Sequence, residues 1–188
     1  TWLKRTQELH EGKRLSLWFQ DEARFGQQGT TCRIWAQQGS RAQAVRQMEF
    51  EWVYLYGAVQ PTRGKSHGCL FPEVNTSTMS LYLENFRRQL AIDEHALMVL
   101  DRAGWHRSRS LIIPSNVTLL YLPPYSPELN PSELLWWQIR DRHMSNRRFA
   151  TVAVLEQAAS DAWLWLTDQA DFLKSLCLFP WIESAVFN

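Results

Sequence analysis

Apolar and polar residues alternate along residues 14–25, and this two-residue period predicts a β-strand. Its two faces would carry different sets, with Ser16, Trp18 and Gln20 on one and Leu15, Leu17, Phe19 and Asp21 on the other. Three further segments between turn-forming residues predict strands at residues 32–36, 52–59 and 69–74, the last at a sheet edge. The first half of the chain is therefore expected to be mostly β-structure.

The period changes after residue 75, where helices and fully buried strands are expected. An amphipathic helix is predicted over residues 79–90, and the hydroxyl residues before it are its N-cap candidates: Thr76, Ser77 and Thr78. Continuous apolar runs at residues 96–100 and 117–122 are typical of strands buried on both faces. These elements predict a mixed α/β sheet covered by helices.

Two helices are expected after the last strand. Asn130 is a suitable N-cap and Pro131 a suitable first residue for a helix that extends to about Met144. Another helix is expected over residues 152–166. The neighbouring indoles of the first helix, Trp136 and Trp137, are both expected in the core.

Composition narrows the class of protein. With 188 residues and 45% hydrophobic content, the chain can form one domain with a full core. Its net charge of +1 gives no support for a nucleic-acid partner, because such domains are often clearly basic. Basic residues gather at 102–109 and 140–148, and a solvated surface is the simplest interpretation of both segments.

The cysteines and the hydropathy pattern indicate a cytoplasmic protein. Cys32, Cys69 and Cys177 are widely separated and odd in number, so they suggest neither a metal site nor a set of disulfides. No apolar run is long enough to span a bilayer, and we expect no membrane partner.

Three carboxylates stand out as candidate chemistry. Asp21 and Asp101 each end an apolar, strand-like run, and Glu133 lies in the first turn of a predicted helix. If the strands at 14–25 and 96–100 are parallel neighbours, Asp21 and Asp101 lie side by side at one end of the sheet. Three converging carboxylates need a cation, and Mg²⁺ prefers oxygen ligands. The pattern indicates metal-dependent phosphodiester chemistry.

Each carboxylate also has a simpler interpretation. Asp21 could be a charged residue at a strand end, and its neighbour Glu22 would face the opposite side of the sheet. Glu133 could complete a capping box with Asn130, and Glu128 is a competing third carboxylate. His106 is more simply a hydrogen-bonded loop residue than a base.

Three blocks of sequence resemble the catalytic blocks of DDE transposases, in the bacterial insertion-sequence (six-thirty family) branch of the mariner superfamily. The resemblance covers about residues 15–182, and its blocks occupy residues 20–26, 99–106 and 123–136: Gln-Asp-Glu-Ala-Arg-Phe-Gly, Val-Leu-Asp-Arg-Ala-Gly-Trp-His and Pro-Pro-Tyr-Ser-Pro-Glu-Leu-Asn-Pro-Ser-Glu-Leu-Leu-Trp. Two features depart from the family: Arg102 stands where Asn is common, and the stretch between Asp101 and Glu133 is a few residues short.

The resemblance implies an RNase H-like, retroviral-integrase-type fold, with a mixed five-stranded sheet and helices on both faces. It implies that Asp21, Asp101 and Glu133 are catalytic and hold two Mg²⁺ or Mn²⁺ ions. It further implies cleavage and strand transfer at insertion-sequence ends, a TA target, a homodimer assembled on DNA, and a nucleoid-associated protein of the bacterial cytoplasm. Residues 14–188 would be the catalytic domain, and residues 1–13 a linker or the end of a preceding DNA-binding region.

Two other functions fit the same residues. The chain could be a catalytically silent domain of this fold that binds DNA or a partner protein. It could also be a host nuclease that hydrolyses DNA without strand transfer, although the Pro-Pro-Tyr-Ser-Pro block disfavours a host nuclease.

Overall fold

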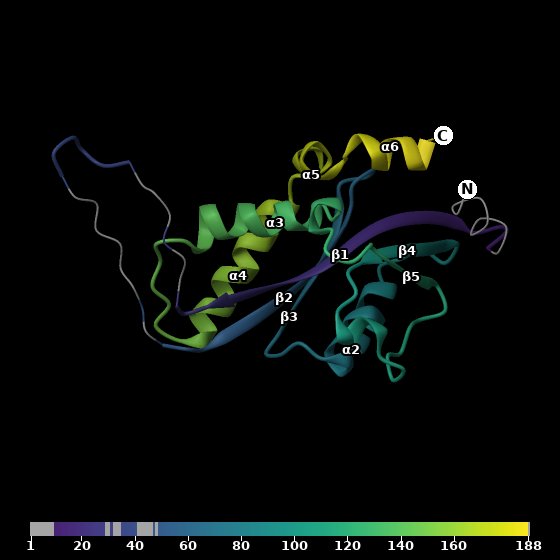
Figure 1. Ribbon diagram of the computed structural model, residues 1–188, viewed down its shortest axis with the longest axis horizontal. Coiled ribbons are helices and arrows are strands. Elements are labelled where there is room, and N and C mark those ends of the chain that lie inside the picture. The colour runs from purple at the N-terminus through teal and green to yellow at the C-terminus, as the bar shows by residue number, and fades with distance from the viewer. Residues whose placement is uncertain (1–9, 29–30, 32–34, 41–46, 48, 188) are drawn as a thin grey trace.

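The computed structural model describes residues 10–28, 31, 35–40, 47 and 49–187, and its centre is one five-stranded sheet (Figure 1). The strand order is β3-β2-β1-β4-β5. The strands are β1 (Arg14–Gly26), β2 (Trp52–Gln60), β3 (Lys65–Phe71), β4 (Glu94–Leu100) and β5 (Val117–Tyr121). Strands β1, β2 and β3 are antiparallel neighbours, whereas β4 is parallel to both β1 and β5. The mixed sheet expected from the resemblance to an RNase H-like fold is confirmed.

The alternation along β1 divides the interior into two cores. Phe19 of β1 belongs to a core that also contains Trp136 and Trp163, here called the α3–α4 core. Trp18, one residue earlier, belongs to a second core with Tyr82 and Met98, here called the α2 core. The sheet lies between the two cores because successive side chains of a strand point to opposite faces.

The helices cover both faces of the sheet, as the resemblance implied. Helix α2 (Thr76–Arg87) packs on one face (Figure 1). The other face is covered by α3 (Ser132–Ile139), α4 (Val152–Thr167), α5 (Ala170–Cys177) and α6 (Pro180–Phe187). Helix α3 continues as a π-helical turn, Arg140–Met144, so the helical segment ends at Met144 as expected. Among the described residues, no helix combines the length and the apolar character needed to cross a bilayer.

Several boundaries differ from the sequence-based expectations. Strand β3 begins at Lys65 rather than residue 69 and ends at Phe71, because Pro72 cannot donate a ladder hydrogen bond. Its predicted place at the sheet edge is confirmed. The strand expected at residues 32–36 falls largely on residues 32–34, which lie outside the described residues.

The expected N-caps were wrong for two helices. Helix α2 is capped by Asn75, whose Oδ1 accepts from the Thr78 N–H at 2.9 Å, while Thr78 Oγ1 accepts from the Asn75 N–H at 3.0 Å. This reciprocal capping box starts the helix three residues earlier than predicted. Helix α3 begins at Ser132 with Pro131, not Asn130, in the N-cap position.

Candidate active site

The register of the sheet places Asp21 and Asp101 at matching positions. The last paired residues of the parallel ladder between β1 and β4 are Phe19 and Val99, and each aspartate lies two residues further along the chain. Asp21 is still in β1, paired with Gly57 of β2, whereas Asp101 directly follows the last residue of β4. The parallel pairing considered from the sequence is therefore present, and it brings the two carboxylates to one end of the sheet.

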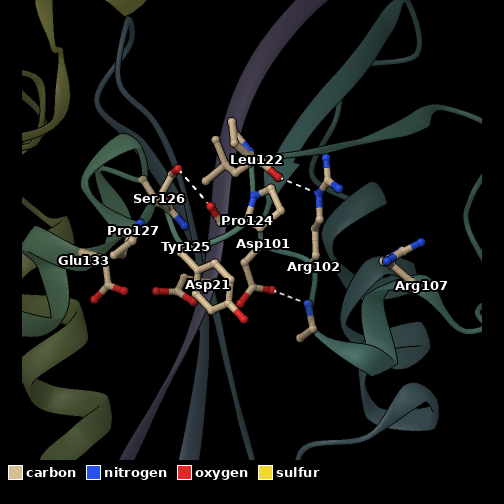
Figure 2. A pocket seen from close by; sticks show the side chains of 13 residues that line it. Asp21, Asp101, Arg102, Arg107, Leu122, Pro124, Tyr125, Ser126, Pro127 and Glu133 are labelled. Carbon is tan, nitrogen blue, oxygen red and sulfur yellow. Dashed lines mark hydrogen bonds between the residues drawn. The ribbon is translucent and has the colours of Figure 1, made fainter.

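Glu133 reaches the same place from the first turn of α3. Asp21, Asp101 and Glu133 all line one cavity of about 550 Å³. Figure 2 shows the three carboxyl groups in a row, with Asp21 between Glu133 and Asp101. Glu128 is exposed and does not line this cavity, which favours Glu133 as the third carboxylate.

Two side chains fasten the start of α3 to β1. Asn130 Nδ2 donates to the Gln20 carbonyl oxygen at 3.0 Å, and Ser132 Oγ donates to the Phe19 carbonyl oxygen at 2.9 Å. Both contacts lie next to Asp21, so the first turn of α3 is held at a fixed place beside that carboxylate.

The capping alternative for Glu133 finds no support in these contacts. In a capping box, the Glu133 side chain would accept a hydrogen bond from the Asn130 N–H. That N–H instead donates to the Pro127 carbonyl oxygen at 2.8 Å. The Glu133 side chain is exposed toward the cavity and is therefore available to it.

Trp136 links Asp21 to the core. Its indole Nε1–H donates to Asp21 Oδ2 at 2.8 Å, and its side chain is almost fully buried. The expectation that Trp136 lies in the core is confirmed, but the same expectation for Trp137 was wrong, because that side chain is 59% exposed. Successive residues of a helix point about 100° apart, so only one of the two indoles faces the sheet.

The indole of Trp136 fits because β2 has a glycine beneath it. A Cβ atom at Gly57 would lie 2.5 Å from Trp136 Cη2 and 2.8 Å from Trp163 Cη2, far closer than normal contact. Gly57 is also the β2 partner of Asp21. The missing side chain at this position thus allows Trp136 to approach Asp21.

The pKa values of the two aspartates shift in opposite directions. Burial raises the pKa of Asp21 to about 7, and the negative charges of Glu133 and Glu22 add to this effect, while the Trp136 hydrogen bond opposes it. The hydrogen bond from His106 keeps the pKa of Asp101 below its usual value despite partial burial. Of the two aspartates, Asp21 therefore gains more from a nearby positive charge.

His106 is a hydrogen-bonded residue of the segment after β4, as the sequence suggested, and it is also buried. It lies in a 3₁₀ turn, η1 (Gly104–Arg107), and only 1% of the residue is exposed. Its Nδ1 is 2.8 Å from Asp101 Oδ1 and its Nε2 is 2.9 Å from Glu22 Oε1. Burial opposes the charged ring, but its hydrogen bonds to the two carboxylates outweigh burial and raise the pKa of His106 to about 9. The ring is an imidazolium at neutral pH and donates to both.

The donor set suits a hard divalent cation, although the side chains are not drawn together around one point. Within the described part of the chain, no three Asp, Glu, His or Cys side chains are close enough together to hold a metal ion as they stand. The cavity nevertheless contains three carboxylates, which are the oxygen ligands that Mg²⁺ and Mn²⁺ prefer. A cation would also offset the repulsion that raises the pKa of Asp21.

Basic and aromatic side chains also line the cavity. Arg102 and Arg107 line it, and the Arg102 Nε–H donates to the Leu122 carbonyl oxygen at 2.8 Å. Tyr125 is fully exposed at the opening, on a backbone with φ of 57°. Cationic groups and an exposed ring beside carboxylates suit a nucleic-acid strand, whose phosphates bind arginine and whose bases stack on aromatic rings.

Comparisons with known proteins identify the family and the fold of the chain. Residues 16–156 match the family described as DDE superfamily endonuclease. The Sinorhizobium fredii protein called "Uncharacterized protein y4pE/y4sA" is 40% identical over 130 residues, which are 69% of this chain and 96% of that protein.

Two solved structures of the Mos1 transposase share the fold, each with 17% identity. One is a paired-end complex with the left transposon end, with a TM-score of 0.65, and the other is a mariner paired end complex with Mn, with a TM-score of 0.68. Each match covers 94% of this chain and 55% of the Mos1 chain, so this chain spans about half the length of that transposase.

Proposed function

The chain belongs to the DDE superfamily endonuclease family and has the fold of a transposase core, and we propose that it is the catalytic domain of a DNA transposase. It would cleave DNA at the ends of an insertion sequence and join those ends to target DNA, with TA as the target dinucleotide. The observation that carries this proposal is the convergence of Asp21, Asp101 and Glu133 on one cavity in a chain of this family.

Asp21, Asp101 and Glu133 would be the catalytic residues and would hold two Mg²⁺ or Mn²⁺ ions. Two such ions stabilise the attacking and leaving oxygens of an in-line phosphoryl transfer. Asp21 lies between Asp101 and Glu133 (Figure 2), so it would share in metal binding with each of them. The Trp136 hydrogen bond to Asp21 Oδ2 would fix the orientation of this carboxylate.

DNA would lie along the cavity wall formed by Arg102, Arg107 and Tyr125. The two guanidinium groups would bind backbone phosphates beside the cleaved bond, and the exposed Tyr125 ring would stack on a base. The similar Mos1 structure is a paired-end complex with a transposon end, which supports DNA as the partner here. The chain would act as a homodimer assembled on that DNA. Residues 14–188 would form the catalytic domain, and residues 1–13 would be a linker or the end of a preceding DNA-binding region.

The decisive experiment measures cleavage and strand transfer separately. The protein is incubated with Mn²⁺, labelled DNA that carries the insertion-sequence ends, and a supercoiled target plasmid, with Asp101→Asn as the matched inactive variant. We expect nicking at the element ends and joined products, both lost in Asp101→Asn. Hydrolysis without joined products would favour a nuclease, and DNA binding without cleavage would favour a catalytically silent domain.

A further inference from the structure

The backbone stops connecting β1 to β4 before either strand reaches its aspartate. The ladder ends at the pair Phe19 and Val99, and Asp101 has already left β4. Asp21 remains fixed by its pairing with β2. A separate contact is therefore needed if the separation of Asp21 and Asp101 is to be constant.

The His106 ring provides such a contact. Its side chain is completely buried and joins Asp101 Oδ1 on one side to Glu22 Oε1 on the other. Glu22 is the neighbour of Asp21 in β1 and is itself held by a 3.0 Å hydrogen bond from Gln20 Nε2. The chain of contacts thus runs from β1 through Glu22 and His106 to Asp101.

Two further contacts fix the ring from outside this chain. Tyr121 Oη donates to the His106 carbonyl oxygen at 2.7 Å, which ties the turn to the end of β5. The Trp105 ring packs against the His106 ring nearly perpendicularly, with the ring centroids 5.6 Å apart at an angle of 74°. The position of His106 is therefore set by β1, β5 and its own turn together.

We propose that His106 is a positioning residue, which extends the alignment of β1 and Asp101 beyond the end of the ladder through its contact with Glu22. This inference rests on the proposed function, in which Asp101 is a metal ligand. Asp101 Oδ1 accepts from the His106 ring and from the Ala103 N–H at 2.9 Å. Both contacts use the same oxygen of Asp101. The other oxygen, Oδ2, would therefore be the one available to a cation.

A direct catalytic role does not suit this ring. Neither nitrogen reaches the cavity, because the side chain is 0% exposed and each nitrogen faces a carboxylate. His106 is also absent from the cavity wall that Asp21, Asp101 and Glu133 share. It acts on the reaction through Asp101 alone.

Mn²⁺ binding to the DNA-free protein tests this role without any cleavage assay. His106→Ala removes both contacts and should weaken Mn²⁺ affinity by about 10- to 100-fold, the range found when groups that orient a metal ligand are removed. His106→Asn keeps a donor at the position of Nδ1 and should recover part of that loss. His143→Ala is the matched histidine control and should bind Mn²⁺ as wild type does, since His143 does not line the cavity.

Substitutions at Glu22 distinguish a positioning role of its side chain from an effect of its negative charge. Glu22→Gln removes the negative charge but keeps an oxygen for the His106 ring, so its Mn²⁺ affinity should stay within about 3-fold of wild type. Glu22→Ala should weaken binding by about 10-fold or more, as orienting groups do. If the bridge acts as one unit, the double variant Glu22→Ala/His106→Ala should bind no worse than His106→Ala alone.

The outcomes distinguish this inference from the proposed function. Wild-type affinity in a folded His106→Ala variant, equal losses in Glu22→Gln and Glu22→Ala, or additive losses in the double variant would each overturn the positioning role alone. Mn²⁺ binding that is unchanged by Asp101→Asn would instead overturn the proposed metal site, and the role of His106 with it. Circular dichroism and melting curves establish that each variant is folded.

Discussion

Gly57 and Trp136 are so close that the indole occupies the space a β2 side chain would fill, with Trp136 Cη2 only 2.5 Å from the position of a Gly57 Cβ. Gly57→Ala should therefore displace Trp136 and weaken its hydrogen bond to Asp21. We expect a loss of about 1–3 kcal/mol in unfolding free energy, as for overpacked cores, together with slower cleavage. Urea denaturation and nicking rates measure the two effects.

Gly104→Ala is the matched control, because a Cβ at Gly104 meets no atom within 4 Å. Its unfolding free energy should stay within about 0.5 kcal/mol of wild type, as for most surface substitutions. If Gly57→Ala were equally mild, the Trp136 indole would not depend on the missing side chain.

The pH dependence of stability should show that ionised Asp21 destabilises the metal-free protein. Its folded-state pKa of about 7 lies above the ordinary value of 3.8, so its contribution favours folding at low pH and is lost as pH rises from about 4 to about 7. Asp21→Asn removes this penalty and keeps an acceptor for Trp136. Measured in EDTA, the variant should gain on the order of 2–4 kcal/mol over wild type at pH 8.

The same gain should shrink steadily as pH falls from about 7 toward 4, because wild-type Asp21 then becomes protonated in the native state. Urea titrations at pH 5, 6, 7 and 8 give the curve. A gain of equal size at every pH would show that its origin is packing rather than ionisation.

Divalent metal should stabilise the native protein through Asp101. Mn²⁺ at about 100 times its dissociation constant adds about 2.7 kcal/mol to the unfolding free energy, or about 5–10 °C in melting temperature for a domain of this size. Asp101→Asn should reduce the shift to less than half, and Glu128→Gln should leave it unchanged. Equal shifts in wild type and Asp101→Asn would place the metal elsewhere.

Glu133 and Glu128 can be separated by a pair of amide substitutions. Glu133→Gln keeps the shape and hydrogen-bonding capacity of the side chain but loses the anionic oxygen that a metal needs. Cleavage should be lost because a metal ligand is missing, while the melting temperature in EDTA stays close to that of wild type. The assay needs metal and DNA that carries the element ends.

Glu128→Gln changes the same proline-rich segment but lies outside the cavity, so its cleavage rate should match wild type. Retained nicking in Glu133→Gln together with lost nicking in Glu128→Gln would exchange the roles of the two glutamates.

The parts of the fold that sequence predicted well are those with a strong local signal. Alternation marks β1 and an unbroken apolar run marks β4, and these two strands deliver Asp21 and Asp101. Helices α5 and α6 were not predicted because each has only eight residues and depends on packing against the α3–α4 core.

The surroundings of the carboxylates were less accessible to sequence reasoning. Glu22 and His106 are 84 residues apart, and neither position carries a periodic signal that links it to the other. The alternation along β1 did indicate that Glu22 faces away from Asp21, but its contact with His106 depends on the three-dimensional position of the η1 turn. The contact between Trp136 and Asp21 could not be predicted for the same reason. The sequence indicated that Trp136 is buried, but not which residue accepts the hydrogen bond of its indole.

The interior is divided into two cores on opposite faces of the sheet. The carboxylates of the site are therefore held in place by two different layers of the protein. Asp21 and Glu133 depend on the α3–α4 core through Trp136 and the first turn of α3. Asp101 depends on the other layer, where η1 and Trp105 pack on the α2 core. Local opening of either layer would separate the carboxylates while the opposite layer stays intact. Competence to cut DNA would then disappear before the protein as a whole unfolds.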